Sequence, residues 1–120
     1  MMLVDTSVWI DHLRRPQSDL SALLDQGQVL VHPFVLGELS LGFLKDRHSF
    51  LETLSRLETA PKAEDEEVLD LVERFDLPRR GLGWVDVHLL ASALLARAGL
   101  LTRDQALKSA WIKVSSARRR

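Results

Sequence analysis

Short apolar runs alternate with longer amphipathic segments along the chain. The short runs are typical of buried strands, whereas the longer segments repeat their apolar positions every three to four residues, roughly the period of a helix. The pattern predicts strands near residues 2–5, 29–31, 58–61, 100–102 and 112–114. It predicts helices over residues 8–14, around 18–26, and over 33–44, 50–57, 64–75, 84–98 and 104–111.

Helices between short apolar strands indicate a parallel sheet, because each return to the same edge of a parallel sheet needs a crossover. We therefore expect an α/β fold, a three-layer α/β/α sandwich around a central parallel sheet of about four to five short strands. We expect a single domain over residues 1–115, followed by a flexible basic tail over residues 116–120. Thr6 and Ser7 are expected to cap the first helix.

Composition narrows the class of protein without naming a function. The chain has 120 residues, 46% of them hydrophobic and 28% charged, with a net charge of -1, which suits one globular core. The absence of cysteine excludes disulfides and thiolate metal sites and suits a reducing cytosol. Only four residues precede Asp5, so we expect no secretory leader. Asp86, His88 and Arg97 interrupt the apolar residues 85–101, which favours a buried helix over a membrane span.

Four acidic residues stand where a solvated carboxylate is not expected. Asp5 and Asp104 follow predicted strands, whereas Glu38 and Asp86 lie within apolar helical segments. Ligands of parallel sheets gather beyond the carboxyl ends of the strands, and buried carboxylates are usually paired or bound to metal. We expect the four acids to converge on a divalent cation that relieves their mutual repulsion. Ligand sets made of oxygen favour Mg²⁺ or Mn²⁺.

Each acid also has a structural explanation when taken alone. Asp5 and Asp104 can be helix N-caps, Asp86 can complement a helix dipole, and Glu38 can be an exposed residue at the rim of its helix. Asp11 competes with Asp5 for a catalytic role, but a solvated helix face explains it. The four histidines include no pair spaced four residues apart, which argues against a zinc site.

Four segments together resemble the motifs of the PIN domain family, specifically of its VapC-type toxins. They are residues 2–11 (MLVDTSVWID), 33–39 (PFVLGEL), 81–93 (GLGWVDVHLLASA) and 100–104 (LLTRD). The order is that of the family, and the resemblance covers essentially the whole chain. Trp84 and Val85 depart from it, because smaller or more polar residues are common there, and this leaves the shape of the pocket open. The resemblance implies a PIN-like fold and endoribonuclease activity that depends on Mg²⁺ or Mn²⁺.

The resemblance also assigns roles to the acids. The catalytic set is Asp5, Glu38, Asp86 and Asp104, and the metal ligands are Asp5, Asp86 and Asp104. Glu38 binds the metal through water or orients the attacking water. One ion and two ions both remain open.

Other side chains are expected to surround the acids. Ser7 and Thr102 are expected to form hydrogen bonds with the waters of the ion. Trp9 and Trp84 can stack on bases, but core packing is the favoured explanation for both. Local basic residues must attract RNA, since the net charge does not. The candidates nearest the acids in sequence are Arg79, Arg80, Arg103 and Lys108.

Partners follow from the resemblance as well. It implies an RNA substrate, a homodimer, a cytoplasmic location without membrane association, and a cognate VapB-type antitoxin. Such antitoxins commonly cover the acidic site, sometimes with an inserted arginine that pairs with carboxylates. The surfaces expected to receive the antitoxin lie near Trp9, Ile10 and Leu13, or near Phe43 and Leu44.

Three alternatives to a nuclease stay open. A Mg²⁺-dependent aspartyl-phosphate phosphatase typically needs a second Asp two residues after Asp5, where Ser7 stands. A receiver domain needs an acidic pair after the first strand, where the chain has Asp5 and Thr6. The third alternative is a non-catalytic PIN-like module that binds RNA or protein and uses its acids as helix caps.

Overall fold

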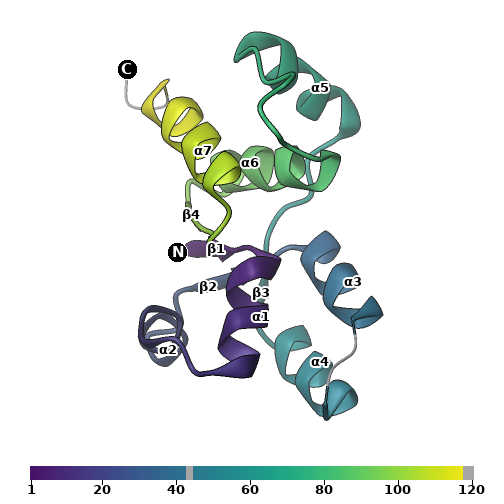
Figure 1. Cartoon of the computed structure of the whole chain (residues 1–120), viewed down its shortest axis with the longest axis vertical. Helices are drawn as coiled ribbons and strands as arrows, with labels where there is room; N and C mark the ends of the chain where they lie inside the picture. The colour runs from purple at the N-terminus through teal and green to yellow at the C-terminus, as the bar shows by residue number, and fades with distance from the viewer. Residues whose placement is uncertain (43–44, 118–120) are drawn as a thin grey trace.

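A parallel sheet of four short strands lies at the centre of the protein. The computed structural model describes residues 1–42 and 45–117 (Figure 1). The strands are β1 (Met2–Val4), β2 (Val29–Val31), β3 (Glu58–Thr59) and β4 (Gly99–Leu101). Their order in the sheet is β3-β2-β1-β4, and every neighbouring pair is parallel.

Pairs of helices connect successive strands. The first two pairs are α1 (Thr6–Arg14) with α2 (Ser18–Asp25), and α3 (Pro33–Leu41) with α4 (Arg47–Ser55). The third pair is α5 (Asp65–Arg74) with α6 (Trp84–Ala96), and α7 (Gln105–Ala117) follows β4. This alternation is the one that the hydrophobic pattern predicts.

The helices form a layer on each side of the sheet. The chain moves outward from β1 to β2 to β3 and then returns past β1 to β4. Because parallel crossovers are right-handed, this reversal places α5 and α6 on the face opposite α1 to α4. Figure 1 shows the two groups, with α5, α6 and α7 above the strands and α1 to α4 below. The predicted α/β/α fold is confirmed.

Helix α6 is the most deeply buried helix of those described. Every residue from 87 to 93 is buried, and α6 packs against β1, β4, α5 and α7. Leu3 of β1 and Leu89 and Leu90 of α6 are completely inaccessible. The apolar character of residues 85–101 therefore reflects burial against the sheet. None of the described helices combines the length and the apolar composition needed to cross a bilayer.

Two local predictions were wrong. Residues 112–114 continue α7 and do not form a strand, because Leu107, Ala110 and Val114 recur at helical spacing on its buried face. Thr6 and Ser7 do not cap α1; Asp5 is its N-cap, and the side chain of Asp5 accepts the Thr6 N–H.

Several predicted boundaries differ from the structure by a few residues; helix α4, for example, begins at Arg47 and not at residue 50. Helix α3 ends at Leu41, before residues 43 and 44, which lie outside the described residues. Residues 116 and 117 continue α7, so the expected basic tail begins no earlier than residue 118. Residues 118–120 also lie outside the described residues, and the division into one domain and a tail stays a prediction.

Candidate functional site

The strand order brings Asp5 and Asp104 to one edge of the sheet. Strands β1 and β4 are neighbours, and Val4 pairs with Leu101 at their carboxyl ends. The Asp5 N–H donates to the Leu101 carbonyl at 2.9 Å. The crossovers flanking β1 run in opposite directions, which makes this end of the sheet a topological switch point, the usual place for a ligand in such folds.

Asp5 is a buried carboxylate, only 7% exposed, and hydrogen bonds compensate its burial. Its Oδ1 accepts the Thr6 N–H at 2.8 Å. Its Oδ2 accepts the hydroxyls of Ser7 at 2.9 Å and Thr102 at 2.7 Å. The Thr102 Oγ1 in turn accepts the Asp104 N–H at 3.0 Å. Ser7 and Thr102 thus hold the carboxylate itself, and contact with the waters of an ion stays a prediction.

Glu38 reaches the site from α3. Its carboxylate Oε1 accepts the Thr6 hydroxyl at 2.8 Å, which links α3 to the start of α1. Glu38 is exposed, because the buried face of α3 consists of Val35 and Leu39. The sequence predicted only a capping role for Thr6, so the bond from Thr6 to Glu38 was missed. The position of Thr6 directly after Asp5 was the only indication in the sequence that Thr6 belongs to the site.

Asp86 lies half-buried in the first turn of α6, where its Oδ2 accepts the Gly83 N–H at 2.9 Å. Burial is the main cause that raises the pKa of its carboxyl, and the negative charges of Asp5, Asp104 and Glu38 raise it further. The Gly83 N–H opposes this rise. Among the described residues no lysine or arginine forms an ion pair with Asp86. Asp86 is therefore near enough to the other three acids to respond to their charge, and the convergence of all four on one cation stays a prediction.

Asp104 is exposed and caps α7, where its Oδ1 accepts the Leu107 N–H at 2.9 Å. Asp5 and Asp86 make similar bonds at the starts of their helices. The capping explanation is therefore correct for three of the four acids. It does not exclude metal binding, because a carboxylate has two oxygens and a capping bond to Asp86 or Asp104 occupies one.

The donor set suits a hydrated Mg²⁺ or Mn²⁺ ion. Within residues 1–42 and 45–117, no three acidic or histidine side chains stand close enough together to form a ready-made metal cluster. Mg²⁺, however, usually keeps several waters and takes only one or two carboxylates directly. The unbalanced negative charge that raises the pKa of Asp86 is also the charge that a cation would neutralise.

Arg103 is engaged within the protein. Its guanidinium donates to Oδ2 and Oδ1 of Asp19 at 3.0 Å each. This pairing lowers the pKa of the Asp19 carboxyl and raises that of Arg103. An RNA phosphate would have to compete with Asp19 for Arg103, so the predicted RNA contact requires that pair to open.

The other basic candidates are exposed. Arg79, Arg80 and Lys108 are all accessible. Gly81 adopts a φ of +76°, which favours glycine, and lies close to α7, since a Cβ built on Gly81 would stand 3.6 Å from the Cβ of Ala106. The loop that carries the two arginines therefore lies beside the start of α7, next to the acidic edge.

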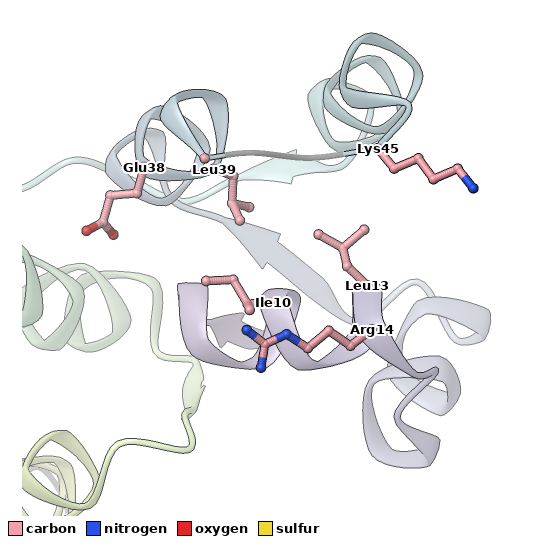
Figure 2. A pocket seen from close by; sticks show the side chains of 7 residues that line it. Ile10, Leu13, Arg14, Glu38, Leu39 and Lys45 are labelled. Carbon is pink, nitrogen blue, oxygen red and sulfur yellow. The ribbon is translucent and has the colours of Figure 1, made fainter.

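A groove of about 320 Å³ runs between α1 and α3 beside Glu38 (Figure 2). Figure 2 shows Ile10 and Leu13 of α1 facing Leu39 of α3, with Glu38 at one end. Trp9, predicted on the same surface, is only 2% exposed and belongs to the core. Phe43 and Leu44 lie outside the described residues. The residues lining the groove are Ile10, Leu13, Arg14, Glu38, Leu39, Gly42 and Lys45.

The parallel sheet and the acids at its carboxyl edge are typical of a class of protein that comparison identifies. The chain belongs to the PIN domain family, which it matches over residues 2–111. It is 49% identical over 111 residues to Ribonuclease VapC32 of Mycobacterium tuberculosis, from strains CDC 1551 / Oshkosh and ATCC 25618 / H37Rv. The match covers 92% of this chain and 90% of each relative. The resemblance to VapC-type proteins is confirmed.

Two solved structures share the fold at low sequence identity. PAE2754 from Pyrobaculum aerophilum has a TM-score of 0.60 and 15% identity, over 96% of this chain and 89% of that one. FitAB bound to an IR36 DNA fragment has a TM-score of 0.61 and 19% identity, over 96% and 91%. These likenesses support the fold assignment alone.

Proposed function

We propose that the protein is a VapC-type endoribonuclease that hydrolyses RNA phosphodiester bonds with the help of Mg²⁺ or Mn²⁺. The observation that carries the proposal is geometric: Asp5 and Asp104 follow neighbouring parallel strands and are linked through the Thr102 hydroxyl. The charges of Asp5, Asp104 and Glu38 add to the effect of burial in raising the pKa of the Asp86 carboxyl, which agrees with a shared site. The 49% identity to Ribonuclease VapC32 supports RNA as the substrate.

Asp5, Asp86 and Asp104 would hold the cation. When bound, the ion would polarise a phosphoryl oxygen and lower the pKa of a coordinated water. Ser7 and Thr102 position Asp5 through its Oδ2, so that its orientation is fixed before any ligand arrives.

Glu38 would act on the water that attacks the phosphate. The Thr6 hydroxyl holds Oε1 of Glu38, which places an exposed carboxylate at the border of the acidic site. A carboxylate so held can orient a water and accept its proton. Arg79, Arg80 and Lys108 would attract the RNA backbone, and Arg103 would join them after release from Asp19.

Removal of divalent metal is expected to stop RNA cleavage and to lower the melting temperature. A cation present at about ten times its dissociation constant adds about 1.4 kcal/mol of stability, or roughly 6 °C for a domain of this size. The experiment compares the metal-free protein with the same protein in millimolar Mg²⁺ or Mn²⁺, by thermal melting and by cleavage of total RNA. A non-catalytic module with acids as caps predicts no cleavage with either metal and an unchanged melting temperature.

We also propose that the groove between α1 and α3 receives a segment of a cognate VapB-type antitoxin. The groove is apolar along Ile10, Leu13 and Leu39 and opens at Glu38, so a bound segment would end next to the acids. Arg14 and Lys45 at its rim favour a segment with acidic flanks.

Ile10→Asp is expected to weaken binding of the purified cognate antitoxin by at least about tenfold, because it places a charge in an apolar contact surface. Ile112→Asp on α7 is the matched control, since Ile112 is 60% exposed and does not line the groove. Isothermal titration calorimetry would measure both affinities. Equal affinities for the two variants would place the antitoxin elsewhere.

The cytoplasmic location and the homodimer are further proposals. A cytoplasmic location agrees with the absence of cysteine, and fractionation of cells that express the protein would test it. The mass of the purified protein in solution, measured by light scattering, decides whether it is a dimer.

A further inference from the structure

Three aromatic rings join α3 to α6, the helices that carry Glu38 and Asp86. The ring centroid of His88 lies 4.8 Å from that of Phe34 and 4.9 Å from that of Trp84, in edge-to-face contacts. Phe34, Trp84 and His88 are called the aromatic shelf from here on. His88 is completely inaccessible and forms the base of the shelf, whereas Trp84 is 44% exposed.

The exposure of Trp84 is unusual for its size. Trp9, the other tryptophan considered for base stacking, is 2% exposed and packs in the core. Core packing, the explanation that the sequence favoured for both residues, is therefore correct for Trp9 and wrong for Trp84. A large aromatic side chain left in water at the edge of a site commonly marks a contact surface.

The aromatic shelf shares α3 with Glu38 and α6 with Asp86. Phe34 and Glu38 are four residues apart on α3 and so share a face, about one turn from each other. Trp84 and Asp86 both lie in the first turn of α6, two residues apart, so their side chains leave different sides of the helix. The shelf therefore lies beside Glu38 through Phe34 and around the start of α6 from Asp86, within the reach of a nucleotide next to the one held at the acids.

Positive charge lies on either side of the aromatic shelf. Nζ of Lys62, which is exposed, stands 4.8 Å from the centre of the Phe34 ring. Arg79 and Arg80 lie in the loop that leads into Trp84, and both are exposed. Aromatic faces flanked by cations are the combination with which proteins bind single-stranded nucleic acid. The cations favour a partner that carries negative charge, such as a nucleic acid, over an apolar protein surface.

We propose that the aromatic shelf binds an unpaired nucleobase of the RNA, next to the phosphate held at the acids, with Trp84 as the stacking face. Lys62 and the two arginines contact the flanking phosphates. This inference rests on the proposed function, because the acids define where the reacting phosphate lies. It restricts the substrate to single-stranded segments such as loops and bulges, since the bases of a duplex stack on each other and are not available to Trp84.

The test separates base stacking from attraction to the backbone. All variants carry Asp5→Asn, which blocks cleavage, and fluorescence anisotropy measures binding of two labelled probes of equal length. One probe is single-stranded oligouridylate, and the other is the same sugar-phosphate backbone without bases. Trp84→Ala is expected to weaken oligouridylate binding by about tenfold and to leave binding of the abasic probe unchanged.

Two further variants control the result. Trp84→Phe keeps a ring and is expected to retain most of the affinity for oligouridylate. Leu95→Ala removes another exposed apolar side chain from α6, 50% accessible, and is expected to change neither affinity. If Trp84→Ala fails to fold, Trp84→Leu takes its place, because leucine keeps an apolar side chain without a ring face.

Three results with Trp84→Ala would overturn the proposal. The first is no loss of oligouridylate binding, and the second is an equal loss of binding for both probes. The third is a change of oligomeric state with RNA affinity unchanged. The last outcome would make the aromatic shelf a contact between two copies of the chain. Failure of the proposed function has a different signature. A protein that never cleaves RNA, yet shows the base-dependent effect of Trp84, would refute the nuclease and retain the nucleobase site.

Discussion

Asp5→Asn is expected to lower metal-dependent RNA cleavage by more than about a hundredfold while the protein stays folded. Even partners that merely orient metal ligands typically contribute roughly 10- to 100-fold, and Asp5 is the acid around which the hydroxyls are arranged. Asparagine retains a side-chain oxygen that can accept the Thr6 N–H, so the cap of α1 persists. It replaces the charged Oδ2, the acceptor of the Ser7 and Thr102 hydroxyls, with a donor.

Asp11→Asn is the matched control for this change. Asp11 lies on the same segment, and its only described ion pair is a weak one, with Oδ2 4.0 Å from Nε of Arg103. Cleavage of total RNA in Mg²⁺ or Mn²⁺, with cleavage-site mapping, measures activity, and circular dichroism with thermal melting reports the fold. Undiminished cleavage by Asp5→Asn, or a loss confined to Asp11→Asn, would refute the assigned role of Asp5.

Acid is expected to destabilise the protein through His32, by about 3 kcal/mol between about pH 6.5 and about pH 4. His32 is completely inaccessible, and its Nδ1 accepts the Phe34 N–H at the start of α3 at 2.9 Å. Burial, followed by the charges of His88 and Lys62, lowers its pKa from 6.5 to about 4. Protonation of Nδ1 would also remove the acceptor that caps α3.

The direction of this effect follows from proton binding. Above about pH 6.5 the histidine is neutral in both the folded and the unfolded chain, so the stability is fully present. As the pH falls below that value, His32 takes up a proton in the unfolded chain, but in the folded protein it stays neutral until about pH 4. Each pH unit in this window therefore lowers the free energy of unfolding by about 1.4 kcal/mol.

Urea unfolding across this pH range measures the effect. His32→Asn keeps a side-chain acceptor for the cap and removes the titrating group, so it is expected to flatten the pH dependence. His48→Asn makes the same change at an exposed position and is expected to keep the slope of the wild type. If His32→Asn and His48→Asn show the same slope, the acid sensitivity comes from the carboxylates and not from His32.

Much of the site was readable in the sequence because its signals are local. An acid that follows a buried strand, as Asp5 and Asp104 do, must lie at the carboxyl end of that strand in a parallel sheet. Asp86 was recognisable because its charge interrupts the apolar residues of a buried helix. The same local signals also fitted helix capping, which three of these acids do perform.

Contacts between distant segments were not predictable in this way. The bond from Thr6 to Glu38 spans 32 residues, and the bond from Thr102 to Asp5 spans 97. Arg103 was predicted to contact RNA, but the fold brings Asp19 of α2 to its guanidinium. Such contacts depend on which strands lie side by side in the sheet. The spacing of apolar residues in a segment predicts whether it is a helix or a strand, but not which other segment it packs against.

The sequence by itself determined the alternation of strands and helices, the burial of α6 and the position of Asp5 and Asp104 after strands, since each follows from local periodicity. It did not determine burial of the acids: Asp5 is buried, but Glu38 and Asp104 are exposed. The tertiary structure decided which tryptophan enters the core and which faces water. Trp9 and Trp84 both lie beside apolar residues, yet Trp9 is on the buried side of α1 and Trp84 begins α6 exposed to water. The packing of the helices on the sheet causes this difference in exposure, because it determines which side of each helix is covered.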